Sequence, residues 1–265
     1  MTVEISIKTK IAPGDSAGIA EAVRDLRSRE PVVFPTETVY GLGCNALDDH
    51  AVARVFAVKD RPRFNPLIVH VRGWDQAMEY VEHNQDASAL AEKFWPGALT
   101  LVLNRNSNCR IARLATAGLD TVAVRAPSDR LAQALIDASG FPLAAPSANR
   151  SGRLSPTTAQ AAFDELSGRV GLILDGGTCQ AGIESTIVGF ENGAPVILRP
   201  GAIPREHIEA VIGPLVERQG QTVTAPGMLA SHYAPGARLR LNAIDIAQGE
   251  ALLAFGETTL NAGVI

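Results

Sequence analysis

The chain has 265 residues, 46% of them hydrophobic, and a formal net charge of −4 at pH 7. This length can bury one large core, or one core plus a smaller domain. The acidic balance argues against a general binder of polyanions, although it leaves room for a local basic cleft. Three widely spaced cysteines without a CxxC pair argue against a disulfide framework or a zinc site and indicate a reducing compartment.

No targeting or membrane segment is expected. The N-terminal stretch "MTVEISIKTK" lacks the apolar core of a signal peptide, and no run of about 18 apolar residues could span a bilayer. We therefore expect a cytoplasmic protein without a membrane partner.

The first half of the chain alternates helical and strand-like patterns. Apolar residues at helical spacing precede the apolar run 32–34, which we expect to form a buried strand. A helix is expected to begin at Asp48 or Asp49, because aspartate caps helix N-termini. Further elements are expected as strands at 65–71, 99–105 and 121–127 and as a helix at 86–95.

The second half continues this mixture. We expect a helix at 128–139 and another opened by Ser155-Pro156-Thr157, with proline at its first position. Strands are expected in "FPLAAPSAN", "VGLILDGG", "STIVGF" and "PVILRPG". The irregular order and the adjacent strands predict an α/β fold with a mixed sheet rather than a strict βαβ repeat.

The pattern weakens after residue 212. Residues 213–236 have the composition of a linker, and "ARLRL" and "ALLAFG" beyond it look like two strands of a second unit. Too few residues follow the linker to bury a core alone. We therefore expect a main domain at 1–212, a linker or lid at 213–236 and the start of an incomplete α/β domain at 237–265.

Hydroxyl, amide and basic side chains gather where the expected strands end. These stretches are "PTETVYG", "KDRPRFNP", "VRAPSD", "APSANRSGRLSPTT", "GIESTIVG" and "LRPGAI". In α/β folds the loops at the carboxyl ends of strands form a crevice in which ligands bind. Each stretch alone could be an ordinary loop, but their repetition predicts a crevice that binds phosphates.

Several residues of these stretches have two interpretations. Lys59 and Arg61 could hold phosphates from one side of an extended chain, or they could form a solvated helix end. His70 shares a strand face with Ile68, where a histidine is more often a core residue than a catalyst. "GLGCNA" matches G-x-G-x-x-A, but the expected helix begins after the motif, so we expect no dinucleotide cofactor there.

Seven motifs, taken in order, resemble those of the YrdC-type threonylcarbamoyl-AMP synthases. They are "PTETVYGLG", "K-x-R-P-x-x-NPLIVHV", "FWPGALTLVL", "TVAVRAP", "PSANxSGxxSPT", "IESTIVG" and "ILRPGAI". "PGMLASHYAP", at 226–235, resembles the linker motif of the long members, which continue into a C-terminal Rossmann-like domain past the point where this chain stops. The resemblance implies a YrdC-like twisted mixed sheet with flanking helices around a concave basic cavity.

The resemblance also implies an activity. Such an enzyme is a nucleotidyltransferase that converts L-threonine, bicarbonate and ATP to threonylcarbamoyl-adenylate and pyrophosphate, with Mg²⁺ carried by the ATP phosphates. The product would serve a downstream threonylcarbamoyl transferase complex that modifies tRNA, and a direct contact with tRNA stays open.

Two alternatives are a double-stranded RNA- or tRNA-binding module without catalysis and a carbamoyltransferase. The lack of aromatics among the basic motifs argues against the first, and the lack of zinc-finger-like cysteines argues against the second.

Carried over residue by residue, the resemblance assigns a site. The positions that match threonine-binding residues are Thr38, His70, Arg125, Ala145 (through its backbone) and Ser185. The positions that match ATP-side residues are Lys59, Arg61, Asn65, Thr121, Ser147, Asn149, Ser155 and Arg199, with His232 or Tyr233 of the linker covering the phosphates. Lys59 and Arg61 are the catalytic candidates, because positioning and charge neutralisation matter more in this chemistry than an acid–base pair.

Overall fold

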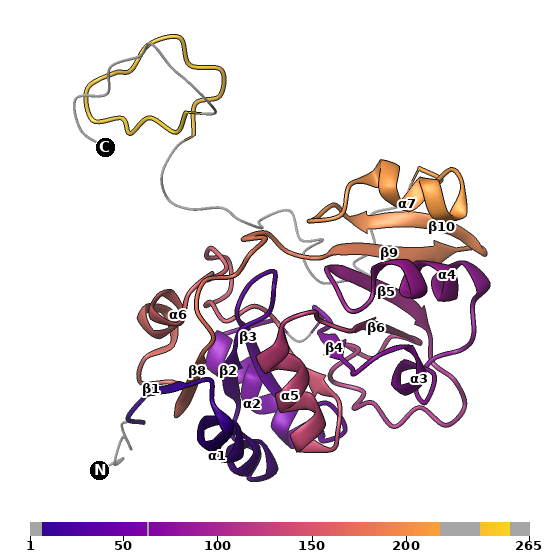
Figure 1. Cartoon of the computed structure of the whole chain (residues 1–265), viewed down its shortest axis with the longest axis horizontal. Helices are drawn as coiled ribbons and strands as arrows, with labels where there is room; N and C mark the ends of the chain where they lie inside the picture. The colour runs from indigo at the N-terminus through magenta and orange to yellow at the C-terminus, as the bar shows by residue number, and fades with distance from the viewer. Residues whose placement is uncertain (1–6, 63, 218–238, 255–265) are drawn as a thin grey trace. The chain divides into compact units, whose positions relative to one another are not determined.

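The computed structural model describes residues 7–62, 64–217 and 239–254 (Figure 1). The chain divides into two units, Met1–Ala234 and Pro235–Ile265, and the described helices and strands all belong to the first. That unit has the mixed α/β fold that the sequence predicts, a twisted sheet with flanking helices.

The described strands form one sheet of ten, in the order β1-β8-β2-β3-β7-β4-β6-β5-β9-β10. Along the chain they are β1 (Lys10–Pro13), β2 (Val32–Phe34), β3 (Gly41–Asn45), β4 (Ile68–His70), β5 (Leu99–Asn104), β6 (Thr121–Arg125), β7 (Leu143–Ala144), β8 (Leu172–Asp175), β9 (Thr186–Glu191) and β10 (Ala194–Arg199). The pairs β1–β8, β2–β8, β4–β6 and β5–β9 are parallel and the others antiparallel, so the sheet is mixed.

The helices cover the sheet unequally. They are α1 (Ser16–Arg27), α2 (Asp49–Lys59), α3 (Trp74–Ala77), α4 (Gln85–Phe94), α5 (Arg130–Ser139), α6 (Ala159–Leu166) and α7 (Arg205–Ile212). The largest core includes side chains of α2, α3, α4, α6 and α7. A second core packs α1 and α5, which lie side by side in Figure 1, on β1, β2, β7 and β8.

A third and smaller cluster lies on β4, β5, β6 and β9. It consists of Ile68, Val102, Ala123 and Ile187, with Leu198 of β10 packed against them. No residue of a described helix belongs to this cluster. The described helices therefore contribute no side chain to this buried cluster, and the candidate site lies at its edge, where Ile68 lines the cavity.

Polar caps explain where the helices begin. The Asp48 carboxylate accepts backbone N–H groups of His50 at 2.9 Å and Ala51 at 3.3 Å, which starts α2 at Asp49 as the sequence predicts. Asp15 and Asp129 cap α1 and α5 in the same way.

The helix expected to open at Ser155-Pro156-Thr157 begins later, at Ala159. Thr158 caps it by accepting the N–H of Ala161 at 3.1 Å. The predicted start is wrong because the Ser155 hydroxyl donates to the Glu184 carboxylate at 2.8 Å, which holds this residue in a loop of the candidate site.

Two strand predictions also need correction. "GLGCN" is the strand β3, which the glycine-rich sequence disguises as a loop. "ARLRL" and "ALLAFG" form no strand over residues 239–254, where the chain makes turns and Leu239, Leu241 and Leu253 are exposed. A strand needs a neighbouring strand to pair with, and the described part of this unit offers none. Among the described residues, no helix combines the length and apolar character that crossing a membrane requires.

Candidate active site

One cavity of the first unit gathers most of the residues that the sequence singles out. The threonine-side positions all line it: Thr38, His70, Arg125, Ala145 and Ser185. Part of the ATP-side set lines it as well: Arg61, Asn65, Ser147 and Arg199. Residues from widely separated stretches of the sequence therefore meet in one place.

Strand register sets His70 beside Arg125. β4 and β6 run parallel, and the two residues pair at the last position of each strand. The N–H of Val71 then donates to the Arg125 carbonyl at 2.9 Å. Side chains alternate along a strand, so His70 projects from the same face as Ile68, and Arg125 from the same face as Ala123. The imidazole and the guanidinium therefore lie together at the end of the face that carries Ile68 and Ala123, and both line the cavity.

The Thr36 hydroxyl closes a tight turn at 36–39. It accepts the N–H groups of Thr38 and Val39, both at 3.2 Å, and donates to the Val39 carbonyl at 2.7 Å. It also lies 2.8 Å from the hydroxyl of Thr38, which is fully buried. Because the Thr36 proton goes to Val39, Thr38 is the donor of this pair and keeps its lone pairs for a ligand.

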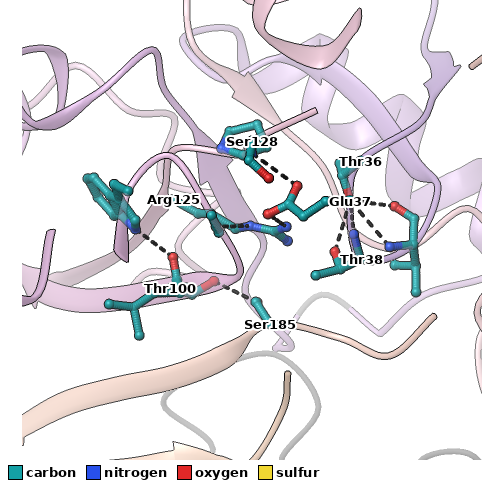
Figure 2. A network of polar contacts seen from close by, with 12 residues as sticks. Thr36, Glu37, Thr38, Thr100, Arg125, Ser128 and Ser185 are labelled. Carbon is teal, nitrogen blue, oxygen red and sulfur yellow. Dashed lines mark hydrogen bonds and ion pairs between the residues drawn. The ribbon is translucent and has the colours of Figure 1, made fainter. Parts of the chain in front are cut away.

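An ion pair holds Arg125 from behind the cavity wall. Figure 2 shows the Glu37 carboxylate between Arg125 and Ser128. One carboxylate oxygen accepts from Arg125 Nη2 at 2.7 Å, and the other accepts from the backbone N–H of Ser128 at 3.1 Å. Arg125 Nε donates to the Gly97 carbonyl at 3.2 Å. The guanidinium is thus fixed at two of its three nitrogens.

His70 is neutral in this environment. Burial, and then the charge of Arg125, lowers the pKa of His70 to about 3. Its ring meets Phe34 edge to face, with centroids 6.0 Å apart and planes at 88°. Gly43 makes room for this contact, because a Cβ there would lie 2.6 Å from the Phe34 ring. At least one glycine of "YGLG" therefore serves packing under the site.

A second network organises the Ser185 side of the cavity. Arg199 Nη2 donates to the carbonyl and the hydroxyl of Ser185 at 2.8 and 3.0 Å, and Nη1 pairs with the Glu184 carboxylate. The Ser185 hydroxyl lies 2.8 Å from that of Thr100, as Figure 2 shows. Glu184 also accepts from Ser155, so this carboxylate joins two of the sequence motifs.

Gly201 allows the "LRPGAI" loop to approach this network. A Cβ at this position would lie 2.4 Å from the backbone of Ser185 and Thr186. Any other residue would push the loop away, and Arg199 with it.

Lys59 does not line the cavity. It is the last residue of α2 and is 1% exposed, and its ammonium donates to the backbone carbonyls of Ser147 and Asn149. Burial, and then the charge of Arg61, lowers the pKa of Lys59 to about 7. The ammonium therefore holds the 147–149 loop, and the interpretation of Lys59 as part of a solvated helix end is wrong.

Arg61 reaches the cavity through a bend of the chain. The backbone of Asp60 adopts the left-handed helical conformation, with φ of 52°, and this residue separates the end of α2 from Arg61. Arg61 Nε and Nη2 donate to the carbonyls of Asn65 and Pro66 at 3.3 and 2.9 Å. Burial, the largest effect, lowers the pKa of Arg61 to about 10. A guanidinium held by carbonyls at the wall of a cavity can bind an anionic ligand.

Five buried side-chain atoms lack a hydrogen-bond partner among the described residues, and three of them belong to predicted site residues; the other two are Arg105 Nη1 and Arg150 Nε. The three are Asn65 Oδ1, His70 Nδ1 and Asn149 Oδ1. Asn149 is fixed by its other amide atom, which donates to the carbonyls of Arg150 and Arg153 at 2.9 and 2.8 Å. Native proteins rarely leave such atoms unpaired, so a bound ligand is the natural partner.

Four described residues of the predicted set do not line this cavity: Lys59, Thr121, Asn149 and Ser155. Thr121 begins β6 and Arg125 ends it, so they are roughly 13 Å apart at about 3.3 Å per residue. Thr121 borders a different pocket, together with Asn104 and Gly189. His232 and Tyr233 lie outside the described residues.

Sequence reasoning gave no site role to Thr36, Glu37 or Glu184. Thr36 closes the turn that presents Thr38, and each glutamate holds an arginine of the cavity. A signal was present, because both glutamates stand inside the polar motifs. Their partners could not be found without the sheet register, which joins residues 88 and 15 positions apart.

The described residues contain no group of three or more His, Cys, Asp or Glu side chains that could hold a metal ion. The two carboxylates nearest the cavity already pair with arginines. This donor set fits a metal that arrives on a ligand better than one held in a cage of protein oxygens.

Together the fold and the cavity define an α/β enzyme of the YrdC type with a small, charged and largely preformed ligand site. The chain matches the family described as "Telomere recombination" over residues 24–201, and the "Threonylcarbamoyl-AMP synthase, C-terminal domain" family over residues 203–262.

Among curated proteins, the threonylcarbamoyl-AMP synthase of Pyrococcus abyssi is 44% identical over 246 residues, which cover 90% of this chain and 71% of that protein. That of Bacillus subtilis is 47% identical over 229 residues, which cover 84% of this chain and 66% of that protein. The crystal structure of P. abyssi Sua5 complexed with L-threonine matches with a TM-score of 0.80 and 44% identity, over 87% of this chain and 69% of that one.

The chain belongs to the Sua5-type threonylcarbamoyl-AMP synthases, nucleotidyltransferases that carry out the first step of threonylcarbamoyl-adenosine modification of tRNA. The family, the fold class and the enzyme class predicted from the sequence are thereby confirmed. The interpretation as an RNA-binding module without catalysis is set aside.

Proposed function

We propose that the cavity binds L-threonine at one end and the ATP phosphates at the other, and that threonylcarbamoyl-adenylate forms between them. The observation that carries this assignment is the set of unpaired buried atoms on Asn65, His70 and Asn149. The related P. abyssi protein was crystallised with L-threonine, which supports a threonine site in this fold.

The threonine end would consist of Thr38, His70, Arg125, Ser185 and the backbone near Ala145. The Arg125 guanidinium suits the ligand carboxylate, and its Nη1 has no hydrogen-bond partner among the described residues. The neutral imidazole of His70 and the lone pairs of the Thr38 hydroxyl suit the ammonium and hydroxyl groups.

The nucleotide end would consist of Arg61, Asn65, Ser147, Asn149, Ser155 and Arg199, with Lys59 supporting the 147–149 loop. Arg61 and Arg199 would neutralise phosphate charge, and Asn65 and Asn149 would each offer an amide oxygen. Thr121 would contact ATP only if the nucleotide extended as far as the pocket that Thr121 borders with Asn104 and Gly189.

In the proposed reaction the threonine amine combines with bicarbonate to give a carbamate and water. A carbamate oxygen then attacks the α-phosphorus of ATP, and the bond to pyrophosphate breaks. The chain's contribution is to align these groups and to neutralise the leaving phosphates with Arg61 and Arg199. A site that excludes water would protect the carbamate from decomposition.

The remaining parts of the assignment are also proposals. Mg²⁺ would reach the site on the ATP phosphates and supply further charge neutralisation. Residues 1–212 would form the catalytic domain, 213–236 a lid that brings His232 or Tyr233 over the phosphates, and 237–265 part of a C-terminal domain. The adenylate would be consumed in the cytoplasm by a transferase complex that modifies tRNA, with or without a direct tRNA contact by this chain.

The two ends can be tested separately by titration calorimetry with L-threonine and a non-hydrolysable ATP analogue. We expect His70→Phe to weaken the binding of threonine and leave that of the analogue unchanged, and Asn149→Ala to do the reverse. The assignment is wrong if either variant loses only the ligand proposed for the other end.

A further inference from the structure

Glu37 pairs with Arg125 of the proposed threonine end but does not itself line the cavity. It borders a neighbouring pocket with Ser128 and Asp129, whereas its partner Arg125 lines the cavity itself. Glu37 therefore stands behind the cavity wall and acts through Arg125.

The geometry of the pair is fixed on both sides. The side chains of Arg125 and Glu37 are only 4% and 10% exposed, so the pair is largely shielded from solvent. Ser128, at the start of α5, holds the second oxygen of the carboxylate through its N–H. Because Ser128 holds one oxygen of the Glu37 carboxylate, the other oxygen fixes the orientation of the Arg125 guanidinium that pairs with it.

The charge of the pair matters as much as its geometry. Arg125 alone would make this end of the cavity cationic, because His70 beside it is neutral and the nearby Arg199 is already paired with Glu184. With Glu37 in place the charge of Arg125 is balanced. When the Glu37 carboxylate balances the charge of Arg125, this end of the cavity suits a zwitterion, which carries both an ammonium and a carboxylate. Without Glu37, the positive charge of the guanidinium would bind any small carboxylate.

We propose that Glu37 is a specificity-determining residue, which orients Arg125 and balances its charge so that the cavity selects an amino acid zwitterion over a simple carboxylate. This inference rests on the proposed placement of L-threonine beside Arg125. Thr38 and Ser185 can bind polar groups of either kind of ligand, so they do not provide this selection.

The probe that isolates the effect is 3-hydroxybutyrate, which is threonine without its amino group. Wild-type protein should bind L-threonine more tightly than 3-hydroxybutyrate. In Glu37→Gln the ratio of the two dissociation constants should shrink on the order of 10-fold, the effect of losing one charge–charge interaction at roughly 10 Å in a medium of ε near 20. The KM for ATP should stay unchanged.

The matched control is Glu30→Gln, which removes the same charge from an ion pair with Arg54 in which both side chains are 48% exposed. That variant should keep the wild-type ratio. A purely structural role for Glu37 would lower the melting temperature of Glu37→Gln and leave the ratio unchanged, and this result would overturn the proposal. Should Glu37→Gln not fold, equal affinity of the wild-type protein for the two ligands contradicts it.

Arg125→Ala separates this inference from the placement on which it rests. If Arg125→Ala binds L-threonine as the wild-type protein does, the proposed threonine site is wrong. If Arg125→Ala loses threonine while Glu37→Gln keeps the wild-type ratio, the site stands and only the role of Glu37 is wrong.

Discussion

The two ends of the cavity are built in different ways. At the threonine end, the Thr36 turn and the Glu37–Arg125 pair fix the side chains before any ligand binds, and His70 Nδ1 is the buried atom left without a partner among the described residues. At the nucleotide end, Asn65 and Asn149 have amide oxygens without a partner among the described residues. Burial also lowers the pKa values of two cations there, Lys59 and Arg61.

The difference suggests different tasks. A site whose groups are already paired and oriented selects a small ligand by shape and charge balance. A site with buried cations and unpaired amides is incomplete until an anion enters, and its charges act most strongly there once water is excluded. We therefore expect substitutions at the first end to change the affinity for threonine, and those at the second to change turnover as well as nucleotide binding.

The largest effect is expected at Arg61. Arg61→Ala should lower kcat on the order of 10²–10³-fold, as for the loss of one group that stabilises charge in a transition state. Arg61→Lys should restore only part of the rate, because an ammonium cannot reproduce the bidentate fork. Steady-state kinetics at saturating substrates measures both, and titration with threonine should give an unchanged affinity.

Arg54→Ala is the matched control, since it removes an exposed arginine from α2, the helix that Arg61 follows. It should keep the wild-type kcat. Near-normal turnover in both Arg61 variants would mean that the nucleotide end does not depend on this guanidinium.

The next effect concerns the choice of amino acid. Serine lacks only the methyl group of threonine, and one apolar contact gives limited selectivity. The kcat/KM for serine should therefore be about 10–200-fold lower than that for threonine. Equal kcat/KM values for serine and threonine would show that no apolar side chain contacts the threonine methyl group. That result would contradict a preformed threonine site.

The turn at 36–39 should matter for stability. Thr36→Val keeps the side-chain volume but removes the acceptor for two buried N–H groups, which should lower the free energy of unfolding by about 1–3 kcal/mol. Urea denaturation measures this change. The KM for threonine should rise, because Thr38 loses its support, and an unchanged KM would show that the turn is independent of the ligand.

The last effect is a pH dependence of stability at the nucleotide end. The pKa of Lys59 is lowered to about 7 in the folded protein, so the unfolded chain binds more protons above that pH. The free energy of unfolding should therefore rise with pH from about 7 to about 10, by about 1 kcal/mol per pH unit relative to Lys59→Met. Denaturation curves measure the free energy of unfolding of the wild-type protein and of Lys59→Met at each pH. If this free energy depends on pH in the same way in both proteins, burial does not neutralise Lys59.

Much of the fold could be predicted from local patterns. α2 begins beside Asp48 because a carboxylate cap is a local signal, and β6 forms where a short run of β-branched and apolar residues predicts a buried strand. β3 was missed because its glycines serve the packing of Phe34, a contact made across the sheet. The start of α6 was missed for a similar reason, since Ser155 binds Glu184, 29 residues away.

In the candidate site, too, local motifs identify some residues, whereas the roles of others depend on contacts between residues far apart in the chain. His70 and Arg125 could be singled out from motifs, but their pairing depends on the register of two strands that are 50 residues or more apart in the chain. The roles of Glu37 and Glu184 depend on which arginine each one meets, and no local pattern carries that information. The different positions of Lys59 and Arg61 depend on the left-handed Asp60 between them.

The most direct test of the account is the release of pyrophosphate from ATP with each substrate left out in turn. Because the nucleophile is a carbamate made from threonine and bicarbonate, pyrophosphate should form only when threonine, bicarbonate and ATP are all present. Pyrophosphate release at the same rate without threonine would contradict the account.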